Sequence, residues 1–234
     1  MKTQNSVFKK WCYLTLMSAL VFSSVKLSAQ EEKRDVSGFN SVSYALPGTL
    51  EIVQGTKESL MIKGDKEDIE KVITRVEGNE LKIYTKSHES NLSDIHILVT
   101  VVQLEELSVA GSGDVNINDV LKSDKFELSL SGSGNVNCDR LEASELELSL
   151  AGSGDVTIAG KVNEIELSIA GSGDVEASEL ESKDAEVSIA GSGSVKVWAT
   201  DKLESSIVGS GDVYYKGRPL VESKTIGSGS TKPL

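Results

Sequence analysis

The chain has 234 residues and is acidic: 36 aspartates and glutamates outnumber 24 lysines and arginines, for a formal net charge of −12. Nucleic acid and anionic membrane surfaces would repel such a chain, so neither is expected as a partner. The whole sequence holds two cysteines, so no disulfide framework is expected to stabilise the fold.

Residues 1–29 are predicted to be a secretory signal peptide. Three lysines precede the apolar run 11–25, and a small-residue motif ending at Ala29 favours cleavage before Gln30. The run is short for a bilayer span, although a retained N-terminal anchor is the alternative. Cleavage would remove four lysines and no acidic residue, which changes the net charge from −12 to −16. We therefore expect an exported protein, in the periplasm, at the cell surface or outside the cell, with no membrane span once the signal is removed.

The next segment is irregular but strand-like. Residues 30–38 have the composition of a polar leader, and 39–100 contain short alternating apolar runs separated by turn signals. Residues 68–76 are compatible with a helix or a strand, because their apolar positions also have helical spacing. Terminal repeats of solenoids usually cap the core, so we interpret 39–100 as irregular first turns plus a cap. The predicted β-helix domain is 39–234, with its regular repeats in 101–234.

From residue 101 the chain repeats one pattern. A Gly-Ser-Gly motif begins at positions 111, 132, 152, 171, 191, 209 and 227. Each copy has an alternating apolar run, the glycine bend, usually followed by aspartate, and a second alternating run, which predicts half-buried strands joined by a tight bend. The glycines are expected to supply positive φ angles. The predicted fold class is all-β: a single-stranded right-handed parallel β-helix, a solenoid with about 18–21 residues per turn.

Alternation also predicts the core. Copies aligned on Gly-Ser-Gly stack their inward residues in columns, one residue from each turn. The predicted columns are Leu128/Leu148/Leu167/Val187, Leu130/Leu150/Ile169/Ile189 and Val136/Val156/Val175/Val195, and a third strand would carry Val120, Leu141, Val162 and Leu180. Cys138 falls in the column of Ile117 and Ile158, so it is expected to be a small buried apolar residue.

The pattern resembles a known family. The matching residues are Phe39-x-x-Val42, the Gly-Asn-Glu-Leu-Lys-Ile stretch at 78–83, the repeated Ser-Gly-Ser-Gly-Asp-Val, and Gly217-Arg-Pro219 with Ile226-Gly-Ser-Gly-Ser230. Over nearly the whole mature chain they resemble the putative auto-transporter adhesin head domains of secreted Gram-negative envelope proteins. The resemblance implies a right-handed parallel β-helix outside the cytoplasm, and the family name implies adhesion.

The aspartates that follow the glycine bends are the first candidate site. They are Asp114, Asp155, Asp174 and Asp212. Stacked carboxylates could bind calcium, which prefers several oxygen ligands. However, Asn135, Ser194 and Ser230 interrupt the column, and Asp, Asn and Ser all accept backbone hydrogen bonds in tight turns. Turn chemistry is the favoured interpretation; no cofactor is expected, and calcium is the alternative.

A column of glutamates is the second candidate, each one five residues before a Gly-Ser-Gly. Its members are Glu106, Glu127, Glu147, Glu166, Glu186, Glu204 and Glu222. Parity points them outward, where neighbouring like charges about 4.8 Å apart repel by about 0.9 kcal/mol per pair in water. The column is either a solvated face that resists edge pairing or a stripe that binds divalent cations or a cationic ligand.

The third candidate is an aromatic pair. Trp198 and Tyr214 are predicted to project outward on neighbouring turns, where they could stack on a sugar ring or cover the end of the core.

Catalysis is not expected from the sequence. The two histidines, His88 and His96, occur in the irregular region, and no Ser-His-Asp spacing, phosphate loop or zinc motif is present. We therefore predict a non-enzymatic β-helix that presents an acidic surface to an envelope or extracellular ligand, a glycan or a protein. The alternatives are a calcium-stabilised structural module and a polysaccharide-active enzyme.

Overall fold

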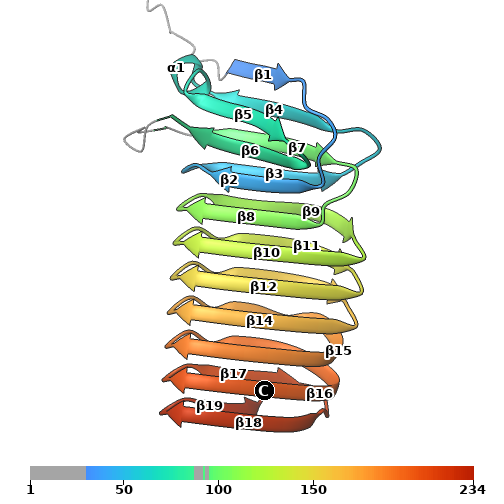
Figure 1. Cartoon of the computed structure of the whole chain (residues 1–234), viewed down its shortest axis with the longest axis vertical. Helices are drawn as coiled ribbons and strands as arrows, with labels where there is room; N and C mark the ends of the chain where they lie inside the picture. Colours follow the sequence, from blue (N-terminus) through green and yellow to red (C-terminus); the bar gives the residue numbers. More distant parts are fainter. Residues whose placement is uncertain (1–29, 87–91, 93–94) are drawn as a thin grey trace, which may run out of the picture.

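The computed structural model describes residues 30–86, 92 and 95–234, which form a tall stack of β-coils with an irregular N-terminal end (Figure 1). The fold is an all-β solenoid, as predicted. The predicted signal peptide and His88 lie outside the described residues. Within the described residues, no helix has the length and apolar character needed to cross a membrane.

Each regular coil consists of a front strand, a glycine bend and a back strand, as seen in Figure 1. The front strands include β8 (Glu106–Gly111), β10 (Lys125–Gly132), β12 (Glu145–Gly152), β14 (Glu164–Gly171) and β18 (Leu220–Gly227). The back strands include β9 (Asp114–Lys122), β11 (Val136–Glu142), β13 (Val156–Lys161), β17 (Asp212–Lys216) and β19 (Ser230–Pro233). Two long strands, β15 (Val175–Gly191) and β16 (Val195–Gly209), each continue from a back strand into the next front strand. As the stack descends in Figure 1, front strands run to the left and back strands to the right, so the coil is right-handed.

Parallel pairing stacks equivalent residues of successive coils. Leu128 pairs with Leu148, and Leu148 pairs with Leu167. Every residue of the three columns that were predicted from Leu128, Leu130 and Val136 is buried, and so is Cys138. The alternation therefore places one apolar face of each strand in a continuous core, which supplies the hydrophobic stabilisation that a single coil lacks.

One predicted core position is wrong. Val120 is only half-buried, and Leu121 instead lies in the core opposite Leu141. The cause is a β-bulge, because β9 has one residue more than β11 between two paired positions. An extra residue reverses the alternation beyond it. Val162 is buried as predicted, but Gly160 is the residue that pairs with Leu141.

The two glycines of each bend differ in backbone conformation, as the bend at 152–154 illustrates. Gly152 has a φ of +138°, a conformation that side chains disfavour, and a Cβ there would also lie 2.1 Å from the carbonyl oxygen of Gly132. Gly154 is not among the residues with positive φ, which corrects the expectation from sequence. A Cβ at Gly154 would lie 2.0 Å from the carbonyl oxygen of Gly134 on the preceding coil. Close stacking of bends, rather than backbone conformation, requires the second glycine.

The N-terminal coils are not stacked in chain order. The coil of β2 (Ser41–Ala45) and β3 (Thr49–Gln54) lies between the first regular coil and the coil of β6 (Glu80–Thr85) and β7 (His96–Val101). Beyond them, β4 (Ser59–Gly64) pairs antiparallel with β7, β1 (Gln30–Arg34) with β4, and β5 (Val72–Glu77) with β6. These strands close the N-terminal end of the core (Figure 1).

The structure gives the secondary structure of two segments of this cap that the sequence did not decide. The short helix α1 (Lys66–Ile69) precedes β5, so residues 68–76 are part helix and part strand. The segment interpreted as a polar leader contains β1, whose Arg34 donates hydrogen bonds to the carbonyl oxygens of Val72 and Ile69. Arg34 therefore ties the first strand to the helix and to β5.

Candidate functional site

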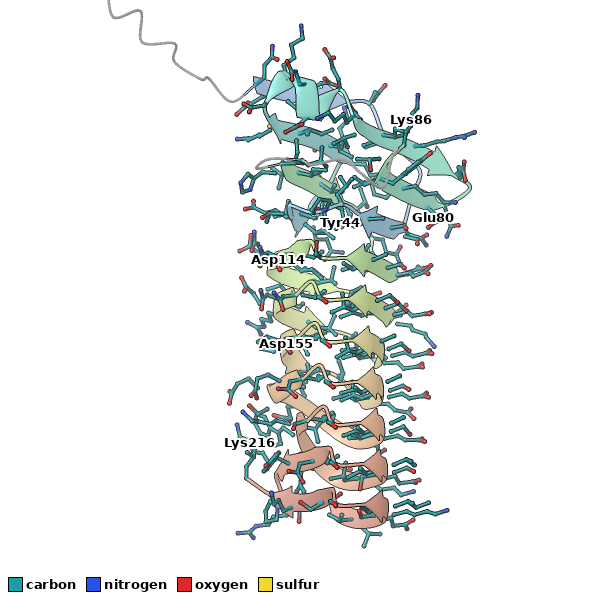
Figure 2. The ribbon with its side chains drawn as sticks, turned by 90° about the vertical axis from the view of Figure 1, so that its left-hand side faces the viewer. Tyr44, Glu80, Lys86, Asp114, Asp155 and Lys216 are labelled. Carbon is teal, nitrogen blue, oxygen red and sulfur yellow. The ribbon has the colours of Figure 1, made fainter. Side chains whose placement is uncertain are left out.

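The outward side of the front strands, here called the front face, carries a continuous line of glutamates. Strand pairing joins Glu106, Glu127, Glu147, Glu166, Glu186, Glu204 and Glu222 in register. Towards the N-terminal end the line continues through Ser41 to Glu80. The front strands lie on the right of Figure 2, where Glu80 is labelled and side chains project in rows down the stack. One carboxylate of this column thus stands on each regular coil.

Two lysines compensate part of the column. The Nζ of Lys125 lies 3.0 Å from a carboxylate oxygen of Glu145 and 3.0 Å from one of Glu147. These hydrogen bonds hold the pKa of Lys125 above its ordinary value. Lys202 forms an ion pair with Glu204 in the same way. All of these groups are solvent-exposed or half-exposed, so each pair contributes little to stability.

The middle of the front face keeps uncompensated negative charge. In the described ranges, four column members have no ion pair or side-chain hydrogen bond: Glu127, Glu166, Glu186 and Glu222. Glu164 and Asp184 precede Glu166 and Glu186 by two residues, pair with each other and are also exposed. Two adjacent coils therefore present four carboxylates on the same side of the sheet.

Between the glutamate column and the bends, most side chains of the front face are small. Two residues after the glutamate stands a serine in six coils, from Ser108 to Ser206, and then Lys224. Two residues further on the column holds alanine or serine from Ala110 to Ala190, before Val208 and Ile226. Near the C-terminal end a shallow hollow of about 320 Å³ is lined by glutamates, serines and Lys224 of this face, together with the inward residues Val187, Ser205 and Ser223.

The candidate aspartates at the bends hydrogen-bond to the next coil. The Oδ1 atoms of Asp114, Asp155, Asp174 and Asp212 each accept a backbone N–H one coil later, at 2.7–3.1 Å. Asn135 Oδ1 accepts the N–H of Asp155 at 3.3 Å. The Ser230 hydroxyl also donates to Asp212 and holds the pKa of that carboxyl below its ordinary value. Figure 2 shows Asp114 and Asp155 on the bend side of the stack.

These contacts give the aspartates a role in joining coils. The described part of the chain contains no group of three or more His, Cys, Asp or Glu side chains arranged to hold a metal ion. Calcium binding stays a prediction.

The two candidate aromatic residues lie on the back strands and are each covered by a lysine. Trp198 pairs with Lys216 of the next coil, whose Nζ is 3.9 Å from the ring centroid. Tyr214 pairs with Lys232, whose Nζ is 4.7 Å from the ring centroid. Such contacts contribute about 0.5–1 kcal/mol at exposed sites. Because the rings stand in different columns, a sugar would meet two separate rings, each with a lysine over one face.

The lysines over the aromatic rings were missed in the sequence, although the signal was present. Each follows its aromatic residue by 18 positions, the local period of the repeat.

The back strands carry a similar column of paired residues at the positions that follow the bulge. Lys122 forms an ion pair with Glu142 at 3.2 Å, and Lys161 forms one with Glu181 at 2.7 Å. Charges on this side alternate along the stack, whereas those of the glutamate column do not.

His96, Cys138 and Tyr44 are described residues of types that can take part in catalysis. His96 is exposed on β7, as predicted for a surface strand residue. Cys138 is 3% exposed, and burial raises its pKa to about 12, so the reactive thiolate does not form near neutral pH. The Tyr44 hydroxyl is buried with no hydrogen-bond partner among the described residues, and burial raises its pKa as well.

This geometry defines a class of protein: a β-solenoid that displays a repetitive acidic surface. Residues 38–219 match the family model described as putative auto-transporter adhesin, head GIN domain, and the chain belongs to this family.

Solved structures share the fold. A putative adhesin from Bacteroides fragilis is 26% identical, with a TM-score of 0.84, and the match covers 88% of this chain and 97% of that one. A putative lipid binding protein from Parabacteroides distasonis is 28% identical, with a TM-score of 0.75 over 88% and 97% of the two chains. A putative adhesin from Parabacteroides merdae, 23% identical with a TM-score of 0.72 over 88% and 96%, shows the fold alone. No curated protein matches the sequence significantly.

Proposed function

We propose that the protein is an exported, non-catalytic binding protein of the adhesin type, whose front face binds a long cationic ligand such as an amino-sugar polymer. The observation that carries the proposal is the unbroken line of glutamates on successive coils, with Glu166 and Glu186 unpaired among the described residues. Neighbouring coils are about 4.8 Å apart, so a flexible chain bearing amines can contact several carboxylates at once.

The ligand class follows from charge and repetition. The front face is acidic and repetitive, and cleavage of the predicted signal would make the chain more acidic still, with the net charge changing from −12 to −16. One exposed ion pair contributes about 0–1 kcal/mol, so useful affinity must come from many contacts along the column. Linked contacts on one polymer raise the effective concentration of each further amine. The family name, adhesin head, agrees with such multivalent binding.

A calcium-stabilised structural module is the second candidate function, favoured by the carboxylates stacked at the bends of adjacent coils, such as Asp155 and Asp174.

The relative named as a putative lipid binding protein suggests a further ligand class. The charged and small polar side chains of the front face do not favour a lipid tail as its ligand.

The test is a titration of the mature chain with chitosan oligosaccharides, which carry free amines. The matched ligand is the N-acetylated chitin oligosaccharide of the same length, which is uncharged. We expect chitosan to bind with an affinity that falls as salt rises, because the contacts are between exposed charges. The chitin oligosaccharide should not bind measurably.

Variants assign the binding to the front face. The double substitution Glu166→Gln and Glu186→Gln should weaken chitosan binding about tenfold or more, since two contacts are lost. The control, Asp139→Asn with Asp201→Asn, removes the same charge from exposed residues outside the front face. Equal loss in both double variants would show that net charge, and not the glutamate column, governs binding, and would refute the proposal.

A further inference from the structure

The two ends of the solenoid differ. At the N-terminal end, antiparallel strands and α1 cover the core, and the outermost strand, β1, presents the exposed charged residues Glu31, Glu32 and Lys33. At the C-terminal end, β18 pairs with β16 along one edge, and the described chain leaves the other edge open. Figure 1 shows β18 and β19 as the last strands of the stack.

The open end exposes apolar side chains. Leu220 and Ile226 of β18 are 67% and 62% exposed, and the chain's last residue, Leu234, is 61% exposed. The inward residue Thr225 is also exposed, whereas Ile207, one coil earlier in the same column, is 1% exposed. An exposed strand edge with apolar neighbours is a template for pairing with another strand. Pro233, which has no N–H, makes β19 a poorer template, so the open edge is concentrated in β18.

The sequence of β18 is complementary to itself in the antiparallel direction. If two copies meet with Ser223 opposite Ser223, Glu222 of each copy faces Lys224 of the other. The same register places Leu220 opposite Ile226 and Val221 opposite Thr225. Residues opposite one another then share a side of the sheet, so the apolar and charged pairs lie outward and the remaining pair closes the core.

Neighbouring registers are unfavourable. Centring the pair on Glu222 places two glutamates opposite each other, and centring it on Lys224 does the same with two lysines. A shift that centres the pair between two residues would put the inward side of one strand opposite the outward side of the other. The charge pattern of the strand therefore selects the register centred on Ser223.

We propose that two copies of the chain associate end to end through β18, as a closed dimer with a twofold axis at Ser223. Such an interface is isologous: each surface contacts its own copy, so association stops at two. Because outward residues face outward residues, the front faces of both copies join into one surface. The dimer would place both glutamate columns on this surface, offset from each other by two residues where the copies meet, although the proposal does not depend on what these columns bind.

Analytical ultracentrifugation of the mature chain over a wide range of concentrations tests the proposal. We expect a monomer–dimer equilibrium with no larger species. A chain that stays monomeric throughout would refute the self-association, and a growing polymer would refute the closed, tail-to-tail geometry in favour of head-to-tail stacking.

Charge exchange tests the register. Glu222→Lys and Lys224→Glu, made singly, each replace two attractive pairs with repulsive ones and should raise the dissociation constant about tenfold or more. The double variant Glu222→Lys with Lys224→Glu restores both pairs and should dimerise again. Lys183→Glu, at an exposed residue away from β18, is the matched control. If the double variant remains monomeric while its circular dichroism spectrum is native, the register is wrong.

A cross-link gives an independent reading that does not depend on charge. In the proposed register, Ser223→Cys brings two sulfurs together across the axis, and mild oxidation should yield a disulfide-linked dimer. Lys183→Cys should remain uncross-linked under the same conditions, and the native Cys138 is buried. Equal cross-linking of both variants would indicate random collision and would contradict the proposed interface.

Discussion

The Oδ1 atom of Asp155 accepts a hydrogen bond of 3.0 Å from the backbone N–H of Asp174, one coil further along the stack. Asp174 in turn accepts the N–H of Ser194 at 2.7 Å, and Asn135 accepts the N–H of Asp155 at 3.3 Å. An aspartate or an asparagine can therefore perform this task. The bends are joined by side chains in addition to the strand ladders, which explains why short polar residues recur after the glycines.

The first prediction concerns this acceptor. Asp155→Ala should lower the free energy of unfolding by about 0.5–1.5 kcal/mol, because the N–H of Asp174 loses its protein partner and must bond to water. Asp155→Asn should be close to wild type, since it retains a carbonyl oxygen in the same place. Denaturant unfolding monitored by circular dichroism measures both. If Asn costs as much as Ala, the charge of Asp155 matters and hydrogen bonding is not its main role.

Calcium provides the second prediction. Because the aspartate oxygens already accept backbone hydrogen bonds, we expect the same melting temperature in calcium and in chelator. A ligand that binds the native state alone would raise the melting temperature as its concentration rises. A calcium-dependent rise that disappears in Asp155→Asn with Asp174→Asn would contradict this expectation and establish the calcium-stabilised module. A rise lost instead in Glu166→Gln with Glu186→Gln would assign the ion to the front face.

The third prediction separates the residues of one bend. Gly154→Ala should be strongly destabilising, because its Cβ would lie 2.0 Å from the carbonyl oxygen of Gly134 and the coils would have to move apart. Ser153→Ala should change the free energy of unfolding by less than about 0.5 kcal/mol, since Ser153 is exposed. Thermal unfolding of both variants is the measurement. Tolerance of alanine at 154 would mean that the bends stack less tightly than the structure indicates.

The repeats made the regular coils predictable, because a period-2 pattern within a copy and a constant bend fix both parity and register. The bulge in β9 was not visible, since Asp119, with a φ of 66°, adds a residue where the sequence shows no glycine. The second bend glycine was misinterpreted because its constraint comes from a neighbouring coil. The order of the N-terminal coils could not be deduced either: the pairing of Ser41 with both Glu80 and Glu106 depends on contacts between segments that share no repeat.

The same distinction applies to the candidate sites. The glutamate and aspartate columns follow from the period, so they could be found by aligning the copies. The lysine above Trp198 could be found only by comparing each residue with the residue one period later, even where the two residue types differ. The self-complementarity of β18 becomes meaningful only once the strand is known to lie at an open edge.

The fourth prediction concerns the core of a central coil. Leu150 is 1% exposed and pairs with Leu130 and Ile169 in the coils on either side. Leu150→Ala should cost about 2–5 kcal/mol, from lost burial and from the cavity left between coils that cannot close fully. Its exposed neighbour gives the control, Ser149→Ala, which should be near neutral. A cost below about 1 kcal/mol for Leu150→Ala in denaturant unfolding would contradict the observed packing.

The last prediction is a pH dependence caused by Cys138. Burial raises the pKa of its thiol from 9.0 to about 12, so between these values the native state keeps a proton that the unfolded state releases. The unfolded state then binds fewer protons, and stability must fall as pH rises, by up to about 1.4 kcal/mol per pH unit. Below the pKa of the unfolded state the thiol is protonated in both states, and stability does not change with pH through this group.

The variant Cys138→Val removes this titration, and its side chain suits a column shared with Ile117 and Ile158. Tyrosines and lysines titrate in both proteins and cancel in the difference. Denaturant unfolding at a series of alkaline pH values should therefore show wild type losing stability faster than the variant. Parallel curves for the two proteins would show that the thiol is not protected from water.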